Sequence, residues 1–370
     1  MSLSVLVVVG PSAGGIGTHV RDLVDELPRH DVAVTVVAHP LTAERFGLRS
    51  AAPWPRLRSR HAVRDLDEVA RLADAADVVH AHGFQAGLVA ALATRVQARR
   101  AGRSTPFVVS LHNQVRGSGL SPRRVVGERA ARWVLRRCTL ATGASSDLVA
   151  DARALGAPRA ELAEVPSPRV PGLLAVDRDV WRSAHRATLL TEHGLDPARP
   201  LAIGLGRAAP QKRFGQLVAA SSTAKGPEQW GIVGPGQEGI ADLARAHGTI
   251  ALLGETDDVE RWLLAADVLV ATSEWEARAL VVQEAMAAGT PVVATEAGGL
   301  PDLLTGVGEL VPSMPAPTFA ERVARAVDAL VDAPERATRM ADEARERART
   351  WPGLDDTAQL WVRWYLSITS

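Results

Sequence analysis

Cysteine is almost absent from this chain of 370 residues, in which Cys138 is the only one. One thiol cannot form an internal disulfide, and the opening segment MSLSVLVVVG lacks the basic flank and the cleavage site of a signal peptide. We therefore expect a reducing compartment, the cytoplasm. Long apolar runs are also lacking, because none approaches the roughly 18 residues that indicate a membrane span.

Net charge is missing as well, since 42 basic residues balance 42 acidic ones. A general nucleic-acid binder needs a basic surface that displaces counterions from phosphates, so nucleic acid is not expected as a partner. Lysine is equally scarce, because Lys212 and Lys225 are the only two among the basic residues. Arginine supplies almost every positive charge, so a lysine in a loop needs a specific reason.

Short β-branched runs alternate with helical stretches along the whole chain. The first series includes SVLVVVG, VAVTVVAH, DVVHAH and PFVVSLH, and a second series starts at LAIGLGRAA and continues to PVVATEAGG. This alternation predicts parallel sheets with crossover helices, and the length exceeds one ordinary core. We expect two doubly wound, Rossmann-like α/β domains, 1–175 and 176–354, with a helix at about 355–370 that packs back on the first. A linker rich in proline is expected near 166–180.

The loop after the first predicted strand is rich in glycine and opens a helix. It contains Gly14, Gly15 and Ile16. Glycine lets a backbone approach an anion closely, and the free N–H groups at a helix start favour phosphate. The spacing departs from the G-x-G-x-x-G pattern, which weakens an oxidoreductase interpretation. A plain chain turn without ligand contact is an equal alternative.

Three histidines follow or end strands of the first series. His80 and His82 alternate at one strand end, which places both rings on one face. No third ligand has convincing spacing, so structural hydrogen bonding is favoured over metal binding. His112 ends the strand PFVVSLH at the edge where α/β sheets bind ligands, and there a functional role is favoured.

The second series carries two cations in the loop after its first strand. In LGRAAPQKRF, Arg207 and Lys212 stand five residues apart, where two positive charges can embrace a diphosphate. The alternative is a solvated loop, which is less persuasive in a chain with two lysines.

A pair of glutamates stands further along, in SEWEARALVVQEAMAAGTPVVAT. Glu276 lies in a loop after a strand, and Glu284 lies inside a helix that starts near Leu280. Eight helical steps span about 12 Å. Glycosidase carboxylate pairs need roughly 5 to 9.5 Å. The spacing therefore favours two carboxylates that hold different parts of one extended ligand, with the N–H groups of Leu280 and Val281 toward its phosphates.

Taken in order, these segments resemble the GT-B glycosyltransferases, specifically the retaining family 4, also described as glycosyl transferases group 1. The resemblance covers nearly the whole chain and rests on Gly14-Gly15, DVVHAH, TPFVVSLH, the segment from LGR to Lys212, IVGPG, LLGETDD, the glutamate block through AGTPVVAT, and AGGLPDLL. It implies two Rossmann-like domains that face a central cleft, with the acceptor bound by the first and a nucleotide-sugar donor by the second.

The resemblance assigns roles to matching positions in the second domain. It implies that Arg207 and Lys212 bind the donor diphosphate, together with the N–H groups of Leu280 and Val281. Glu284 would hold the ribose. The loop that meets the nucleobase would consist of Gly254, Glu255 and Thr256.

Further roles concern the reacting sugar. The resemblance places Gly15 and Ile16 near the donor phosphates, His112 near the reacting carbon and Glu276 on the transferred sugar, and we take His112 and Glu276 as the catalytic pair. The family often has Phe-Gly in the donor-sugar loop where this chain has Arg278-Ala279, so the sugar is not specified.

The resemblance also implies a reaction. Such enzymes move a sugar from a UDP- or GDP-sugar to a hydroxyl of a glycan, lipid or small molecule, retain the anomeric configuration, and need no metal or other cofactor. A nucleotide-sugar epimerase of the same fold is the alternative. The asparagine-glycine turn often found before the linker is replaced by Ser167-Pro168-Arg169, a change expected to affect the hinge more than the chemistry.

A basic amphipathic segment lies at 121–137. Its arginines alternate with apolar residues such as Val126 and Trp133, a pattern typical of helices that rest on anionic membranes. A solvated helix that packs on its own domain is favoured over membrane contact.

Overall fold

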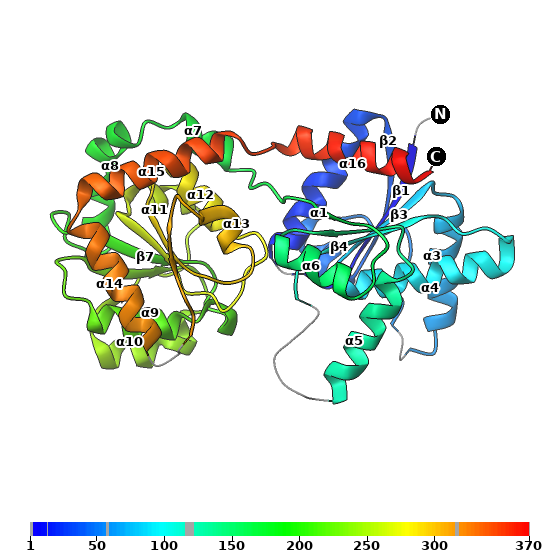
Figure 1. Ribbon diagram of the computed structural model, residues 1–370, viewed down its shortest axis with the longest axis horizontal. Coiled ribbons are helices and arrows are strands. Elements are labelled where there is room, and N and C mark those ends of the chain that lie inside the picture. Colours follow the sequence, from blue (N-terminus) through cyan, green and yellow to red (C-terminus); the bar gives the residue numbers. More distant parts are fainter. Residues whose placement is uncertain (1–2, 13, 57–58, 115–121, 315–317, 370) are drawn as a thin grey trace. The chain divides into compact units, whose positions relative to one another are not determined.

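The computed structural model describes residues 3–12, 14–56, 59–114, 122–314 and 318–369. The chain divides into two compact units, Met1–Pro166 with Pro352–Ser370, and Ser167–Trp351. Each unit contains one six-stranded parallel sheet with helices on both faces (Figure 1). The predicted α/β architecture with two doubly wound sheets is confirmed.

The first unit has the strand order β2-β1-β3-β4-β5-β6. Val5 to Val9 of β1 are at most 1% exposed, because a central parallel strand is covered on both faces. The strands are β1 (Leu3–Val9), β2 (Val32–Ala38), β3 (Val78–His82), β4 (Phe107–Leu111), β5 (Leu140–Gly143) and β6 (Ala160–Leu162). The helices are α1 (Gly15–Glu26), η1 (Leu27–His30), α2 (Pro40–Phe46), α3 (Ala62–Asp74), α4 (Phe84–Ala101), α5 (Pro122–Leu135), α6 (Ser146–Ala154) and α16 (Leu354–Thr369).

The C-terminal helix α16 belongs to the first unit. Trp361 and Tyr365 lie one helical turn apart on its buried face, and both are at most 1% exposed. They share a core with Val7 of β1 and Val20 of α1. The end of the chain therefore contributes large aromatic side chains to the core of the N-terminal sheet.

The second unit has the strand order β12-β11-β10-β7-β8-β9. Separate apolar clusters cover the two faces of its sheet. The strands are β7 (Leu201–Leu205), β8 (Gln229–Val233), β9 (Ile250–Leu252), β10 (Val268–Ala271), β11 (Val292–Thr295) and β12 (Glu309–Val311). The helices are α7 (Val170–Ala175), α8 (Arg178–Glu192), η2 (Pro210–Lys212), α9 (Phe214–Thr223), η3 (Gln237–Ile240), α10 (Ala241–His247), α11 (Val259–Ala265), α12 (Leu280–Ala288), α13 (Leu300–Leu304), α14 (Phe319–Val331) and α15 (Pro334–Arg349).

The boundary between the two units lies after Pro166, nine residues before the expected boundary at residue 175. Val170 and Leu173 of α7 are buried in the same cluster as Met286 of α12 and Ala344 of α15. This short helix therefore joins the core of the second unit, and the division falls after Pro166. Prolines in this stretch suggested a linker, but its apolar residues find partners in the second core.

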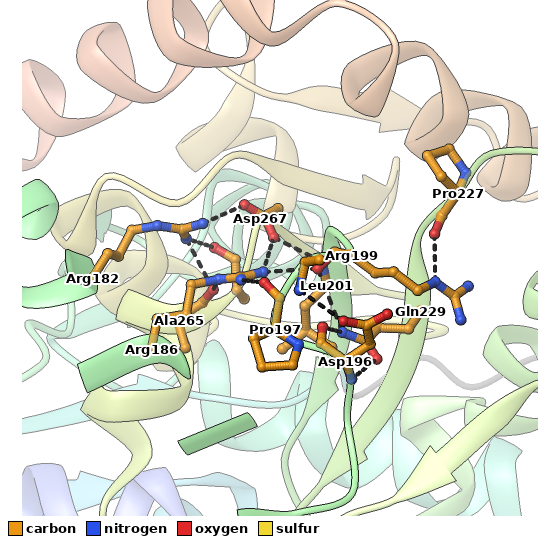
Figure 2. Close-up of polar contacts among 12 residues, drawn as sticks. Arg182, Arg186, Asp196, Pro197, Arg199, Leu201, Pro227, Gln229, Ala265 and Asp267 are labelled. Carbon is orange, nitrogen blue, oxygen red and sulfur yellow. Dashed lines mark hydrogen bonds and ion pairs between the residues drawn. The ribbon is translucent and has the colours of Figure 1, made fainter. Parts of the chain in front are cut away.

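A polar network holds α8 to the amino edge of the second sheet (Figure 2). Asp267, just before β10, accepts hydrogen bonds from Arg182 at 2.6 Å and from Arg186 at 2.8 Å. It also accepts one from the backbone N–H of Leu201 at the start of β7. The same two arginines donate to the carbonyl of Ala265, the last residue of α11. Cations at a helix C-terminus satisfy carbonyls that lack intrahelical partners.

Within the described ranges, no helix is both long enough and apolar enough to cross a membrane.

Candidate active site

Several residues that were predicted to bind the nucleotide-sugar donor lie in loops at the carboxyl ends of the strands of the second sheet. The chain passes from β7 to β8 and β9 on one side, and then returns to β10 on the other side of β7. Strand order thus reverses between β7 and β10, and doubly wound sheets bind ligands at the carboxyl ends of the strands at such a switch point. Lys212 follows β7 and Glu276 follows β10, so the two loops flank this point.

Lys212 and Glu276 form an ion pair across the two loops. The Lys212 Nζ lies 2.8 Å from Glu276 Oε1, which also accepts a hydrogen bond from Ser273 Oγ at 2.8 Å. Their side chains are 24% and 16% exposed, respectively. The carboxylate therefore fixes the position of the ammonium group at the sheet edge while leaving part of it accessible.

Hydrogen bonds from side chains to main-chain carbonyls also join these loops. The Thr272 hydroxyl donates to the Lys212 carbonyl at 2.9 Å, and the Gln211 amide donates to the Trp275 carbonyl at 2.6 Å. Arg213, next to Lys212, has φ +49°, a left-handed conformation that is uncommon for a residue other than glycine. Hydrogen bonds to the main chain beside Lys212 and beside Glu276 therefore hold the two loops together.

Gly298 supports the Glu276 loop from a third strand end, after β11. Its φ is +60°, and a Cβ at this position would lie 2.2 Å from the Glu276 carbonyl oxygen. The Gly299 N–H donates to that same carbonyl at 2.8 Å. The segment AGGLPDLL contributed only to the family resemblance, and the supporting role of Gly298 was not predicted. The signal that could have indicated it is the pair of adjacent glycines after a strand.

Glu284 lies in the second turn of α12 and is almost fully buried. Its side chain is 3% exposed, and Oε1 accepts hydrogen bonds from Ser167 Oγ at 2.7 Å and from Arg169 Nη1 at 3.3 Å. Burial raises the pKa of Glu284, while the contacts with Ser167 and Arg169 oppose that rise. The segment 167–169 was expected to affect the hinge. Its Ser167 and Arg169 instead donate hydrogen bonds to Glu284, the residue predicted to bind the ribose.

The N-terminus of α12 presents the residues predicted to face phosphate. Ala279 is its N-cap, and its side chain makes no capping hydrogen bond to the first turn, where the amides of Leu280 and Val281 lie. Arg278 is 8% exposed, with its guanidinium carbon 5.4 Å from the centre of the Trp351 ring. The unusual Arg278 of the predicted donor-sugar loop thus packs on an aromatic ring of its own unit.

The remaining predicted donor residues follow β7 and β9. Arg207 is exposed directly after β7, while Gly254 accepts a hydrogen bond from the Gly234 N–H at 2.7 Å. Glu255 is exposed, and the Thr256 hydroxyl accepts from the Asp258 N–H at 3.0 Å. The strands β10, β7, β8 and β9 are neighbours, so these loops share one edge with the ion pair.

A cavity of about 660 Å³ occupies the opposite edge of this sheet. Its lining includes Pro200 and Pro291, which precede β7 and β11. Two of its arginines already have backbone partners: Arg178 donates to the Ala266 carbonyl and Arg345 to the Val176 carbonyl. The residues whose chemistry was predicted from the sequence lie at the carboxyl edge instead.

In the first unit, Gly15 and Ile16 begin α1 directly after the loop that follows β1. Gly15 is exposed and Ile16 is half-buried. His112 follows β4 and is 9% exposed, and its Nε2 lies 3.2 Å from His82 Nδ1. The two imidazole planes are 13° apart.

Four buried histidines gather beside these residues. His19 of α1 lies 5.7 Å from the rings of His82 and His112, and the rings of His80 and His82 are 4.0 Å apart. Burial lowers the pKa of His112 to about 3 and that of His19 to about 4. Burial also holds the pKa of both His80 and His82 well below the ordinary value. The cluster is therefore uncharged at neutral pH.

His80 has the structural role that was favoured for it. Its Nδ1 lies 2.6 Å from the Tyr365 hydroxyl and its Nε2 2.7 Å from Ser110 Oγ. Across the described residues, three potential metal ligands come within 4.8 Å of one another only at Glu26, His30 and Asp355. None of these three was a predicted site residue.

Comparison with known proteins identifies both halves of the chain. Residues 14–168 match the family described as glycosyl transferase 4-like domain, and residues 199–329 match glycosyl transferases group 1. Alpha-maltose-1-phosphate synthase of Mycobacterium tuberculosis is 30% identical over 90% of this chain and 90% of its own length. D-inositol 3-phosphate glycosyltransferase of Streptomyces griseus is 40% identical over 32% of this chain and 24% of its own.

Solved structures show the same fold at lower identity. HepE of Anabaena in complex with UDP has a TM-score of 0.79 at 19% identity, over 99% of this chain and 100% of its own. Sucrose-phosphate synthase of Thermosynechococcus elongatus has a TM-score of 0.75 at 19% identity, over 99% of each chain. The predicted GT-B fold is confirmed by these neighbours.

Proposed function

Because this chain belongs to the group 1 glycosyltransferases, we propose that it moves a hexosyl group from a UDP- or GDP-sugar to an acceptor hydroxyl with retention of anomeric configuration. A donor of this class is supported by HepE, whose structures were determined with UDP and with UDP-glucose. The acceptor hydroxyl belongs to a glycan, a lipid or a small molecule.

The observation that carries this proposal is the ion pair at the switch point of the second sheet. Lys212 and Glu276 flank the place where a doubly wound sheet binds its ligand, and α12 starts there with an alanine as N-cap, which offers no side-chain hydrogen bond to the first N–H groups. An ammonium group and a helix N-terminus favour a diphosphate, whereas a carboxylate accepts hydrogen bonds from sugar hydroxyls.

In the proposed reaction the bond between the anomeric carbon and the diphosphate oxygen breaks, and its electron pair stays with the diphosphate. The acceptor oxygen forms the new bond on the same face of the sugar, and its proton leaves with the diphosphate. Lys212 and Arg207 stabilise the charge that develops on the leaving group, which is the largest contribution expected in such a site. This route uses neither a covalent nucleophile nor a metal ion or other cofactor.

A screen of nucleotide sugars tests the donor assignment. Isothermal calorimetry should detect one UDP- or GDP-sugar that binds well above the others, and NMR of the product should show the anomeric configuration of the donor. Activity should persist in EDTA if no metal takes part. An inverted product, or activity that disappears with EDTA and returns with Mg²⁺, would contradict the mechanism.

The epimerase alternative makes a different product. An epimerase interconverts the sugar of the free donor without an acceptor, whereas a transferase releases nucleoside diphosphate when an acceptor is supplied. Incubation of the identified donor alone, followed by chromatography of the nucleotide sugars, separates them. A second nucleotide sugar in that mixture would support epimerisation.

We also propose a cytoplasmic location with peripheral membrane contact through 121–137. The feature that supports contact is α5, on which Val125 and Val126 are 43% and 66% exposed close to Arg129. Flotation with anionic vesicles should recover the protein at low salt and lose it as salt rises. Val126→Ser should weaken flotation, whereas Val63→Ser should not, because Val63 is 84% exposed on α3 outside this segment. Equal flotation of both variants would contradict contact through α5.

A further inference from the structure

A glutamate, a histidine and an aspartate meet where the C-terminal helix packs on the first unit. Glu26 is the last residue of α1, His30 is the last residue of η1, and Asp355 lies in the first turn of α16. Helix α16 lies against α1 within this unit (Figure 1). Each of the three side chains places one potential ligand atom within 4.8 Å of the other two. Side chains from both ends of the chain therefore gather at one point.

The backbone beneath these side chains is held by the apolar core. Leu27, next to Glu26, is fully buried in the same cluster as Ala358 of α16. Ala358 follows Asp355 by three residues, so both lie on the same side of that helix. Glu26 and His30 are four residues apart, which is the spacing at which two side chains of one helix can bind one ion. The three residues thus stand on elements that are packed together.

Each carboxylate has one oxygen held by its own element and directs the other toward the imidazole. Arg29 Nη1 donates to Glu26 Oε2 at 2.8 Å, and Gln359 Nε2 donates to Asp355 Oδ2 at 2.8 Å. The remaining oxygens, Glu26 Oε1 and Asp355 Oδ1, lie 4.0 Å and 3.2 Å from His30 Nε2. Hydrogen bonds to the second oxygen of a carboxylate orient the first one toward a metal ion.

The Nε2 atom of His30 is enclosed, yet it makes no hydrogen bond within the described chain. The contact with Asp355 is short but lacks the geometry of a hydrogen bond. Asp355 is 64% exposed, so a rotation of its side chain uncovers the nitrogen and admits an ion from solvent. A buried nitrogen without a partner is costly, and a cation bound between it and the two carboxylates would remove that cost.

Ligand type and spacing restrict the kind of ion. In a tetrahedral Zn²⁺ site, with bonds of about 2.0 to 2.1 Å, neighbouring ligand atoms lie about 3.3 Å apart. His30 and Asp355 have this separation, and Glu26 has to approach His30 by less than about 1 Å to reach it. An imidazole beside carboxylates suits Zn²⁺, whereas Mg²⁺ and Ca²⁺ prefer oxygen ligands alone. Arg29 offsets only one of the two negative charges, so the site favours a cation.

We propose that Glu26, His30 and Asp355 bind one Zn²⁺ ion, with water as the fourth ligand, and that this ion holds α16 to the junction of α1 and η1. Its role is structural, because it secures the helix with which the chain returns to the first unit after Trp351. Helix α1 has 12 residues and spans about 18 Å, so the ion lies that far from Gly15 at the opposite end. The ion takes no part in the proposed transfer, which needs no metal.

Titration of the metal-free, untagged protein with Zn²⁺ tests this site. Isothermal calorimetry should show a site whose dissociation constant rises at least tenfold in Asp355→Ala and in His30→Gln, because loss of even an outer partner of a ligand costs about tenfold. Asp355 is largely exposed, so its variant should fold normally. Zn²⁺ should raise the melting temperature of the wild type and slow hydrogen exchange in the first turn of α16. Mg²⁺ and Ca²⁺ should do neither.

His61→Gln is the matched control, since His61 is exposed at the start of α3 and should leave the affinity for Zn²⁺ unchanged. EDTA should lower the melting temperature of the Zn²⁺-loaded wild type and leave that of Asp355→Ala unchanged. If the wild type binds no Zn²⁺, the site does not exist. If both Asp355→Ala and His30→Gln keep the affinity of the wild type, the ion binds at other residues and the proposal is overturned.

Discussion

The ammonium group of Lys212 lies 2.8 Å from a carboxylate oxygen of Glu276, across a separation of 64 residues in the chain. The contact joins the loops that diverge at the switch point of the second sheet. In the free protein each charge neutralises the other, so a diphosphate that approaches Lys212 meets a cation already positioned. In the proposed reaction, the second carboxylate oxygen of Glu276 would accept a hydrogen bond from a sugar hydroxyl.

Lys212→Ala should lower kcat/KM about 100-fold or more, because the variant loses a positioned cation at the leaving group. Steady-state kinetics with the identified donor provide the measurement. Lys225→Ala is the matched control, since Lys225 is the other lysine of the chain and is exposed after α9. Similar kinetics for both alanine variants would remove Lys212 from the site.

Gly298→Ala should displace the Glu276 loop. The added Cβ would lie 2.2 Å from the Glu276 carbonyl oxygen in a left-handed conformation, so we expect a loss of stability above about 2 kcal/mol together with weaker donor binding. Gly306→Ala isolates the conformational part, because Gly306 has φ +83° and open space around it, and should cost about 1 kcal/mol. Urea unfolding and donor calorimetry on both variants give the comparison. Equal effects would show that the contact with Glu276 is unimportant.

Most of both sheets was predictable because buried parallel strands appear as apolar β-branched runs. The short edge strands β6, with the sequence AEL, and β12, with the sequence ELV, lack that pattern and were not predicted. Lys212 and Glu276 were each singled out, but their pairing was not. It depends on β10 lying beside β7, and the alternation of strands and helices does not specify that order. The contact of Ser167 with Glu284, 117 residues apart, was missed for the same reason.

His19 should make the first unit sensitive to acid. Burial lowers its pKa from 6.5 to about 4 in the folded protein, so the unfolded chain binds the proton first as pH falls. The stability contributed by neutral His19 is present above pH 6.5 and is lost toward pH 4, by an amount on the order of 3 kcal/mol. Urea midpoints at pH 7 and pH 4.5 should therefore differ less in His19→Gln than in the wild type. His61→Gln, at an exposed position, should leave the difference unchanged.

Asp267→Ala should destabilise the second unit by about 2 to 3 kcal/mol, because it removes one carboxylate from two arginines and from the start of β7. Asp267 is 29% exposed, so solvent compensates part of the loss. The exposed ion pair of Asp242 with Arg245 provides the control, and Asp242→Ala should change the melting temperature little. Calorimetry that shows equal melting temperatures for both variants would contradict a structural role of the network in Figure 2.

Ser167 and Glu284 should behave as a coupled pair in donor binding. Ser167→Ala removes the 2.7 Å hydrogen bond to a carboxylate that is 3% exposed, so a larger fraction of Glu284 should be protonated and the affinity for the nucleoside diphosphate should fall. Glu284→Gln keeps an acceptor for the serine but removes the charge. A double-mutant cycle on the dissociation constant should give a coupling of about 1 kcal/mol, because the two changes affect one interaction. Independent effects would mean that Ser167 orders only the start of the second unit, and that the donor does not depend on how Glu284 is held.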